Sequence, residues 1–168
     1  MLIAETSESQ AAIPRDVAAM GGECYAEVDG PRCIALLPDT GHAPPSWKPT
    51  RARMLFAGGR YGGDAGDWLF RVGLWVPTSH RAELLAWYEQ EHLPILLDYP
   101  SWEGCRFVEV RIATGLQFIA LHQLAEREAL NSPSRARSRD TPWFHRLKQH
   151  AWFDQAFTRV LYRRPTAP

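Results

Sequence analysis

The amino-acid sequence predicts an α+β fold with one antiparallel sheet and helices on one of its faces. Apolar residues recur at the period of strands in three segments, which are 68–76, 102–111 and 116–124. Two dipeptides, Ser132-Pro133 and Thr141-Pro142, each place a capping residue before a proline, as is typical of helix starts. The chain has 168 residues, which suits one domain with a sizeable core.

The N-terminal part is expected to hold one hairpin and little other regular structure. Residues 1–20 are polar and small, which predicts a frayed or weakly helical segment. Cys24–Leu37 is predicted to be a hairpin, because Asp29-Gly30 lies between two apolar runs. We then expect a proline-rich loop over 38–50 and a short strand over 54–57. A flexible glycine-rich connection follows, and its glycines do not form a phosphate-binding pattern.

From Trp68 onward the predicted elements are regular. A strand ends at Pro77 and a helix then runs to about Leu93, where Pro94 should kink or end it. The remaining elements are two strands joined by a turn at Thr114-Gly115, one or two helices, the second running from Trp143 to about Gln155, and a last strand, Phe157–Arg163. The order β-α-β-β-α-β is ferredoxin-like. The uncovered sheet face is apolar, so a second subunit or the N-terminal segment must cover it.

Composition excludes several classes of partner. Lys+Arg and Asp+Glu both number 19, and this zero net charge argues against a nucleic-acid surface. No window is apolar over a bilayer-spanning length, and the N-terminus does not resemble a secretory signal. The three cysteines, which form no CxxC pair, are expected to be reduced thiols in a cytoplasm. The basic run Arg135, Arg137 and Arg139 is interpreted as a solvated loop or helix face.

The segment Trp87–Pro94 supplies the candidate catalytic residues. His92 shares a helix face with Leu85 and Tyr88, so its titratable ring points to the interior beside a proline. His92 would be the acid or base, and Tyr88 could orient it or a substrate oxygen. The alternative, a core histidine bonded to a carbonyl or hydroxyl group, stays open, as does simple packing for Tyr88.

Further residues are candidates for substrate binding. Arg106 could hold an anion, although an ion pair with Glu103 or Glu109 explains it equally well. His122 faces either the helices or the partner of the sheet. The candidate aromatic walls are Trp75, Trp102 and Trp143. No metal site is expected, because the six histidines form no HxH or HExxH pattern, and His145 and His150 point to different faces of one helix.

Residues 68–164 resemble the dimeric α/β-barrel superfamily, and within it the EthD-like small proteins. The resemblance rests on Trp87-Tyr88-x-x-x-His92-Leu93-Pro94, with support from Tyr99-Pro100-x-Trp102 and Thr141-Pro142-Trp143. It implies a homodimer whose two sheets pair face to face, with a pocket between the sheet and the helices of each subunit. Activities in the superfamily include cofactor-free oxygenation of aromatics, lactone isomerisation, polyketide cyclisation and haem-dependent reactions. Residues 1–67 depart from this pattern. They are interpreted either as a hairpin that caps the barrel or as a degenerate second module.

Two classes of function are therefore carried forward. The first is a small enzyme, without a cofactor, of the cyclase, isomerase or monooxygenase type. It would act on a hydrophobic cyclic or aromatic small molecule through proton transfer by His92. The alternative is a non-catalytic module that binds a small molecule or serves oligomerisation. An open cavity with polar groups near His92 would favour the enzyme or the binding module, whereas a filled core would favour oligomerisation.

Overall fold

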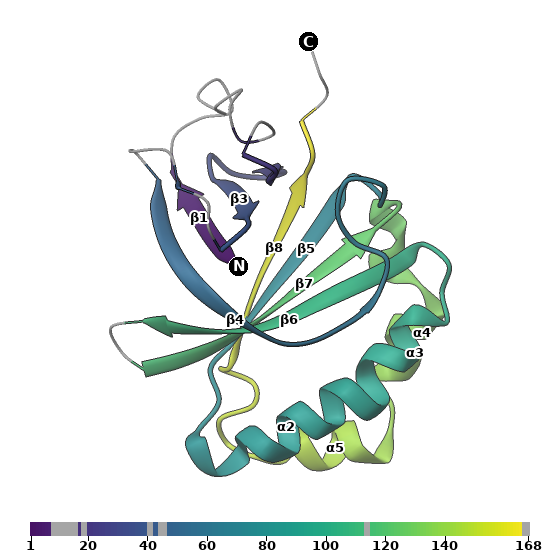
Figure 1. Cartoon of the computed structure of the whole chain (residues 1–168). Helices are drawn as coiled ribbons and strands as arrows, with labels where there is room; N and C mark the ends of the chain where they lie inside the picture. The colour runs from purple at the N-terminus through teal and green to yellow at the C-terminus, as the bar shows by residue number, and fades with distance from the viewer. Residues whose placement is uncertain (8–16, 18–19, 40–41, 44–46, 113–114, 166–168) are drawn as a thin grey trace.

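The computed structural model describes residues 1–7, 17, 20–39, 42–43, 47–112 and 115–165. Within these residues, eight strands form a closed antiparallel barrel in the order β1-β3-β2-β8-β5-β7-β6-β4 (Figure 1). The strands are β1 Leu2–Thr6, β2 Glu23–Glu27, β3 Cys33–Leu37, β4 Lys48–Gly59, β5 Trp68–Leu74, β6 Trp102–Ile112, β7 Gly115–Leu124 and β8 Phe157–Arg163. The last four strands lie where the sequence predicts them, and the turn at Thr114 lies outside the described residues.

Two helical connections cover one side of the C-terminal strands, as Figure 1 shows. The first joins β5 to β6 and consists of η2 Thr78–His80, α2 Arg81–Trp87, the π-turn η3 Tyr88–His92 and α3 Leu93–Leu97. The second joins β7 to β8 and consists of η4 Arg127–Asn131, α4 Pro133–Ser138 and α5 Pro142–Lys148. With the strand order β8-β5-β7-β6, this half has the ferredoxin-like arrangement. None of the described helices is long and apolar enough to cross a membrane.

The second predicted helix is shorter than expected. It ends at Lys148 instead of about Gln155, and turns follow as far as β8. Phe153 and Ala156 are buried in those turns, whereas Ala151 is exposed. The apolar spacing that suggested a continued helix therefore belongs to a turning segment that packs against the core.

The N-terminal part contains more strand than the sequence indicates. Residues 2–6 form β1, which pairs with both β3 and β4, so the expectation of a frayed or weakly helical start was wrong there. Leu2, Ile3 and Ala4 are all buried, and this apolar run outweighs the polar residues that follow it. The strand expected over 54–57 is twelve residues long, because β4 pairs with β1 at one end and with β6 along the rest.

The barrel closes within one chain. The hairpin β2–β3 forms with Cys24 opposite Ala35 and Cys33 opposite Ala26, and all three cysteines are free thiols. As the sequence predicts, this hairpin joins the main sheet, since β2 pairs with β8, and β4 pairs with β6 on the other side. The apolar face of the C-terminal sheet is thereby covered by β1–β4. Of the two covers that the sequence allows, a second subunit or the N-terminal segment, the structure has the second, and the homodimer stays a prediction.

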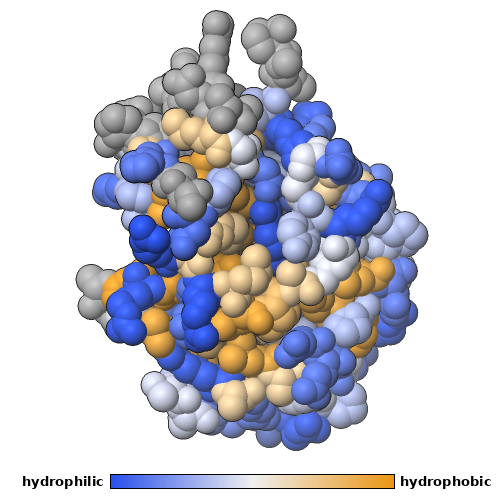
Figure 2. Space-filling model, viewed as in Figure 1, coloured by the Kyte–Doolittle hydropathy of each residue, from blue (hydrophilic) through white to orange (hydrophobic). Residues whose placement is uncertain are grey.

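Two hydrophobic cores lie on opposite faces of the C-terminal sheet. The barrel interior is filled by side chains from both halves, among them Ile3, Tyr25, Leu69, Val108 and Leu121. The other core lies between the sheet and the helices and includes the aromatic residues Phe70, Trp87, Tyr88, Trp102, Phe107 and Phe144. Figure 2 shows hydrophobic residues gathered in a band across the middle of this view, with hydrophilic residues around them.

Candidate functional site

The helix between β5 and β6 does not end at Pro94, so of the two expected outcomes, a kink or an end, the end is excluded. It widens by one π-turn, in which the N–H of Leu93 donates to the carbonyl of Tyr88, five residues back. Proline has no N–H and its ring would meet the carbonyl four residues earlier, so a wider turn relieves this conflict. The turn runs from Tyr88 to His92, so the two candidate catalytic residues stand at its ends. Such turns are frequent at functional sites.

A cavity of about 600 Å³ lies between this helix, the second helical connection and the sheet. Its volume is within the usual range for small-molecule sites. Tyr88 and His92 line it, together with Trp102 and His122 from the sheet. Aromatic side chains form much of the remaining wall, namely Phe70, Trp87, Phe144, Phe153 and Phe157. The core beside His92 is therefore open rather than filled.

Three side chains form a hydrogen-bonded chain at the sheet side of the cavity. The indole Nε1 of Trp102 donates to Nδ1 of His122 over 3.1 Å. Nε2 of His122 lies 2.6 Å from the hydroxyl of Tyr88. Because an indole N–H only donates, Nδ1 of His122 must be the nitrogen without hydrogen. The neutral ring then carries its hydrogen on Nε2 and donates it to the oxygen of Tyr88.

This arrangement leaves the hydroxyl hydrogen of Tyr88 for a group in the cavity. Burial, and then the nearby Cys105, raise the pKa of Tyr88 well above its ordinary value, although Arg159 opposes the shift. The phenol therefore keeps its proton. Burial also lowers the pKa of His122 well below its ordinary value, with smaller contributions from His92 and Arg135. His122 is thus a neutral group that orients Tyr88, and not a proton acceptor.

His92 has the complementary arrangement. Its Nδ1 lies 3.4 Å from the carbonyl oxygen of Ser138, which can only accept, so Nδ1 carries the hydrogen. Nε2 keeps its lone pair and has no hydrogen bond among the described residues. The ring of His92 lies against that of Trp87, with the two centroids 4.4 Å apart. Burial lowers the pKa of His92 to about 4; the hydrogen bond to Ser138 opposes this shift, and the charges of Arg139 and Arg135 add to it. The imidazole is a neutral base at pH 7.

The cavity is also lined by four cationic side chains and one acidic one. The cations are Arg135, Arg139, Lys148 and Arg159, and the acid is Asp154. Among the described residues none of these cations has an ion pair. Arg135 donates to the carbonyl of Leu130 over 2.6 Å, and burial followed by the like charges of Arg139 and Arg159 lowers its pKa. This excess of positive charge favours an anionic ligand.

The arginines of the basic run differ in what they face, and two of them line the cavity, Arg135 partly buried and Arg139 exposed. Arg135 and Arg139 are four residues apart, so both turn toward the cavity. Arg137 points elsewhere and pairs with Asp98, as expected of a solvated residue. The four-residue spacing shows that Arg135 and Arg139 share a helix face. Only the position of α4 over the sheet shows that this face borders the cavity.

Three of the predicted binding residues lie outside the cavity wall. Arg106 is buried on the barrel side of the sheet, where it forms two hydrogen bonds of 2.7 and 3.1 Å with Glu23. Neither Glu103 nor Glu109 is its partner, since these pair with Arg60 and Arg53. Trp75 is exposed beside a shallower depression. Trp143 packs against the edge of the helix-side core.

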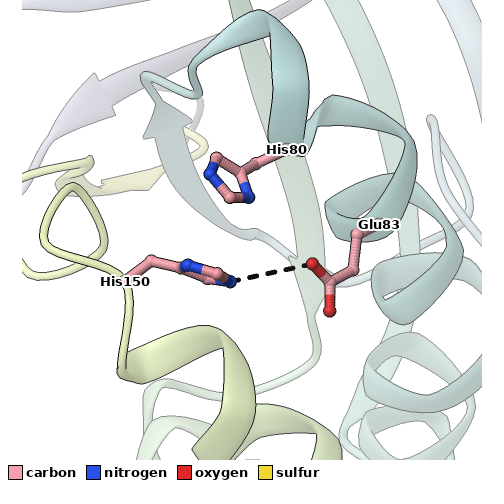
Figure 3. A group of neighbouring side chains, drawn as sticks. All are labelled: His80, Glu83 and His150. Carbon is pink, nitrogen blue, oxygen red and sulfur yellow. Dashed lines mark ion pairs between the residues drawn. The ribbon is translucent and has the colours of Figure 1, made fainter.

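A second group of polar side chains lies at the outer end of α2. His80, Glu83 and His150 bring their ligand atoms within 4.8 Å of one another (Figure 3). The sequence expectation of no metal-ligating group did not anticipate this cluster, because His150 is far from His80 in the chain. Only the packing of α2 beside the end of α5 unites them.

Comparisons with known proteins place the fold. No protein-family model matches the sequence, and no curated protein matches it. A ferredoxin-fold protein of Listeria monocytogenes, related to antibiotic biosynthesis monooxygenases, is structurally similar with a TM-score of 0.66 and 11% identity, covering 99% of this chain and 95% of that one. LmHde, a heme-degrading enzyme from the same species, gives a TM-score of 0.64 and 10% identity, covering 98% and 100%.

A third similar structure is an anthrone oxidase-like protein, with a TM-score of 0.63 and 9% identity, covering 98% of this chain and 90% of that one. At such identities the likeness concerns the fold alone. The narrower resemblance to EthD-like proteins stays a prediction. The chain has a ferredoxin-like fold that is similar to the folds of these three proteins.

Proposed function

We propose that the cavity is the active site of a small monooxygenase-type enzyme that acts, without a bound cofactor, on a hydrophobic aromatic or cyclic molecule. One observation carries the proposal. The two ends of a single wide helical turn present a neutral imidazole lone pair, on His92, and a phenolic hydrogen, on Tyr88, to an aromatic cavity. A base beside a hydrogen-bond donor is what proton abstraction next to a carbonyl or phenol requires.

The two side chains would act together. Nε2 of His92 takes a proton from an acidic carbon of the substrate. Tyr88 donates its hydrogen bond to the substrate oxygen on which the negative charge develops. The bond from His122 holds the Tyr88 hydroxyl in place and leaves its hydrogen free for this task. Arg135 and Arg139 favour the anion through their charge.

The resulting carbanion is the reductant for molecular oxygen. An activated methylene group flanked by two aromatic rings reacts with one molecule of dioxygen to give a ketone at that carbon and one molecule of water. The carbon loses its two hydrogens and four electrons. Dioxygen accepts these electrons, and its two atoms end in the ketone and in the water. The likeness in fold to an anthrone oxidase-like protein supports this class of substrate.

The proposal is tested by oxygen uptake with a hydroxylated anthrone and the full chain. We expect uptake above the buffer rate, with formation of the corresponding quinone. His92→Ala should lower kcat by about 10²–10⁴-fold, the usual contribution of a general base. His145→Ala is the control, because that exposed histidine pairs with Asp140 outside the cavity and should leave kcat unchanged.

Two results would contradict this function. Equal kcat for His92→Ala and the unchanged chain would remove His92 from the reaction. Saturable quenching of tryptophan fluorescence by the probe, without oxygen uptake, would favour the non-catalytic binding module.

Haem binding is a second candidate, favoured by the free Nε2 of His92 within an aromatic cavity lined by cationic side chains. His92 would hold the iron, and Arg135 and Arg139 would meet the carboxylates. Bound haem would supply oxygen activation. Titration with haemin should then shift its absorption spectrum in the unchanged chain but not in His92→Ala. The absence of any shift would exclude this candidate.

A further inference from the structure

A compact group of three metal-ligating side chains lies outside the cavity, as Figure 3 shows. His80 ends η2, Glu83 lies in the first turn of α2, and His150 follows α5. Nε2 of His150 is 3.8 Å from Oε2 of Glu83, and the centroids of the two imidazole rings are 4.2 Å apart. All three residues are partly exposed.

We propose that His80, Glu83 and His150 bind a divalent transition-metal ion of the Zn²⁺ type. Two imidazole nitrogens and one carboxylate oxygen form a donor set that suits zinc, with the fourth position left for water. Bonds of about 2.0–2.1 Å to zinc place tetrahedral ligand atoms about 3.4 Å apart. The present group spans at most 4.8 Å, so rotations of partly exposed side chains are enough to close it.

The surroundings leave these ligands available. Among the described residues, the ionisable groups of His80, Glu83 and His150 have no hydrogen bonds or ion pairs other than the one that joins Glu83 and His150. The indole of Trp152 stacks on His150, at 5.9 Å and 12°, and its centroid lies 5.6 Å from that of His80. Arg81, the nearest cation in sequence, donates instead to the carbonyls of Val76 and Leu116.

A simple ion pair accounts less well for the cluster. A separation of 3.8 Å between Glu83 and His150 is too long for a hydrogen bond. A metal ion satisfies both rings in their neutral form and also neutralises the carboxylate. The positive end of α2 opposes a cation, and the charge of Glu83 offsets that effect.

The bound ion would join two walls of the cavity. Glu83 belongs to the helix that carries Trp87 and Tyr88, and His150 belongs to the segment that carries Phe153 and Asp154, all of which line the cavity. A clip between these segments would restrict how far they separate. The ion would not itself touch the cavity.

The test is calorimetric titration of the chelator-treated full chain with ZnCl2. We expect one saturable site, and no comparable binding of MgCl2, because magnesium prefers oxygen ligands. At a zinc concentration of about one hundred times Kd, Tm should rise by about 5–10 °C. His150→Ala and His80→Ala should each weaken binding by at least about tenfold, since loss of even a supporting group costs that much.

The matched control is His145→Ala. That histidine forms a 3.0 Å pair with Asp140 but has no second imidazole nearby, so its loss should leave zinc affinity unchanged. Glu83→Gln keeps the shape of the side chain and should still weaken binding, which separates lost ligation from misfolding. The proposal would be overturned if the unchanged chain did not bind zinc. It would also be overturned if His80→Ala and His150→Ala bound zinc as tightly as the unchanged chain. Binding at a cysteine would give the second result.

Discussion

At the scale of single residues, the cavity is defined by where its hydrogen atoms lie. Trp102, His122 and Tyr88 come from two strands and a helix, and each hydrogen bond fixes the direction of the next. His92 is fixed separately by the carbonyl of Ser138. As a result His92, which the sequence predicts to be the base, has a free lone pair on Nε2. His122 has no free lone pair, because its Nδ1 accepts from Trp102. Sequence could place His92 and Tyr88 in the cavity wall, but the hydrogen bonding of His122 depends on Trp102, twenty residues away in the chain.

Replacement of Tyr88 by phenylalanine should destabilise the protein. The change leaves the Nε2–H of His122 buried without an acceptor, which costs about 1–3 kcal/mol of unfolding free energy. Tyr99→Phe is the control, because no hydrogen bond of its hydroxyl is found within the described residues. Urea denaturation of both variants measures the difference. Equal losses in the two variants would show that the bond to His122 contributes nothing.

The low pKa of His92 predicts that acid destabilises the fold. The unfolded chain has a histidine pKa near 6.5, whereas burial against the cavity wall lowers the pKa of His92 to about 4 in the folded chain. Between these values the unfolded state binds more protons, so the stabilisation is complete above pH 6.5 and is lost as pH falls toward 4. His122 shifts in the same direction.

This prediction is measured as the pH dependence of unfolding free energy in His92→Gln against the unchanged chain. The variant should lose less stability between pH 6.5 and 4, by on the order of 2 kcal/mol once the partial exposure of His92 is considered. The contributions of the carboxylates are common to both proteins, so they cancel when the two stability curves are subtracted. Parallel curves would show that His92 has an ordinary pKa.

At the scale of elements, the helix starts and an irregularity at Pro94 were predictable, whereas the form of that irregularity, a π-turn, was not. Ser132 and Thr141 cap α4 and α5 as their positions before proline indicate, since each side chain accepts a hydrogen bond from a backbone N–H three residues on. Pro94 signals a break, but whether a helix ends or widens depends on what holds both sides. Here Leu93 and Leu96 are both buried, so continuing the helix through a π-turn keeps them in the core.

Loss of the Ser132 cap should weaken α4. Ser132→Ala removes the acceptor for the N–H of Arg135, and such changes cost about 1 kcal/mol of stability. Because Arg135 lines the cavity, affinity for an anionic aromatic ligand should also fall. Ser79→Ala is the control, since Ser79 is exposed and η2 has no side-chain cap bond. Denaturation midpoints of the two variants should differ; identical midpoints would refute the role of the cap.

At the scale of the whole molecule, two sets of four strands share one order. The N-terminal order β4-β1-β3-β2 repeats the order β8-β5-β7-β6, when strands are numbered within each half. We infer that residues 1–67 are a second ferredoxin-like module, with the domain boundary near residue 67. Such a module supplies inside one chain the sheet that a partner subunit would otherwise supply. Short apolar runs such as residues 2–4 hide this repeat from sequence reasoning.

A chain that begins at Gly66 should therefore lose solubility or change its oligomeric state. Removing β1–β4 exposes the barrel face of the remaining sheet, where Leu69, Val108 and Leu121 are wholly buried in the full chain. Exposed apolar faces of this kind associate. Light scattering should show dimers or larger aggregates of the shortened chain beside the full chain. A soluble monomer with unchanged Tm would show that the first half is an appendage.

The central claim is that His92 presents a lone pair and Tyr88 a hydrogen to the cavity. Nitrogen-15 NMR of the histidine side chains tests this directly, without a substrate, when His92→Gln and His122→Gln are used to assign the two rings. We predict that both rings are neutral at pH 7, with the hydrogen on Nδ1 of His92 and on Nε2 of His122. A charged imidazolium at either residue, or the opposite tautomer of His122, would contradict the account.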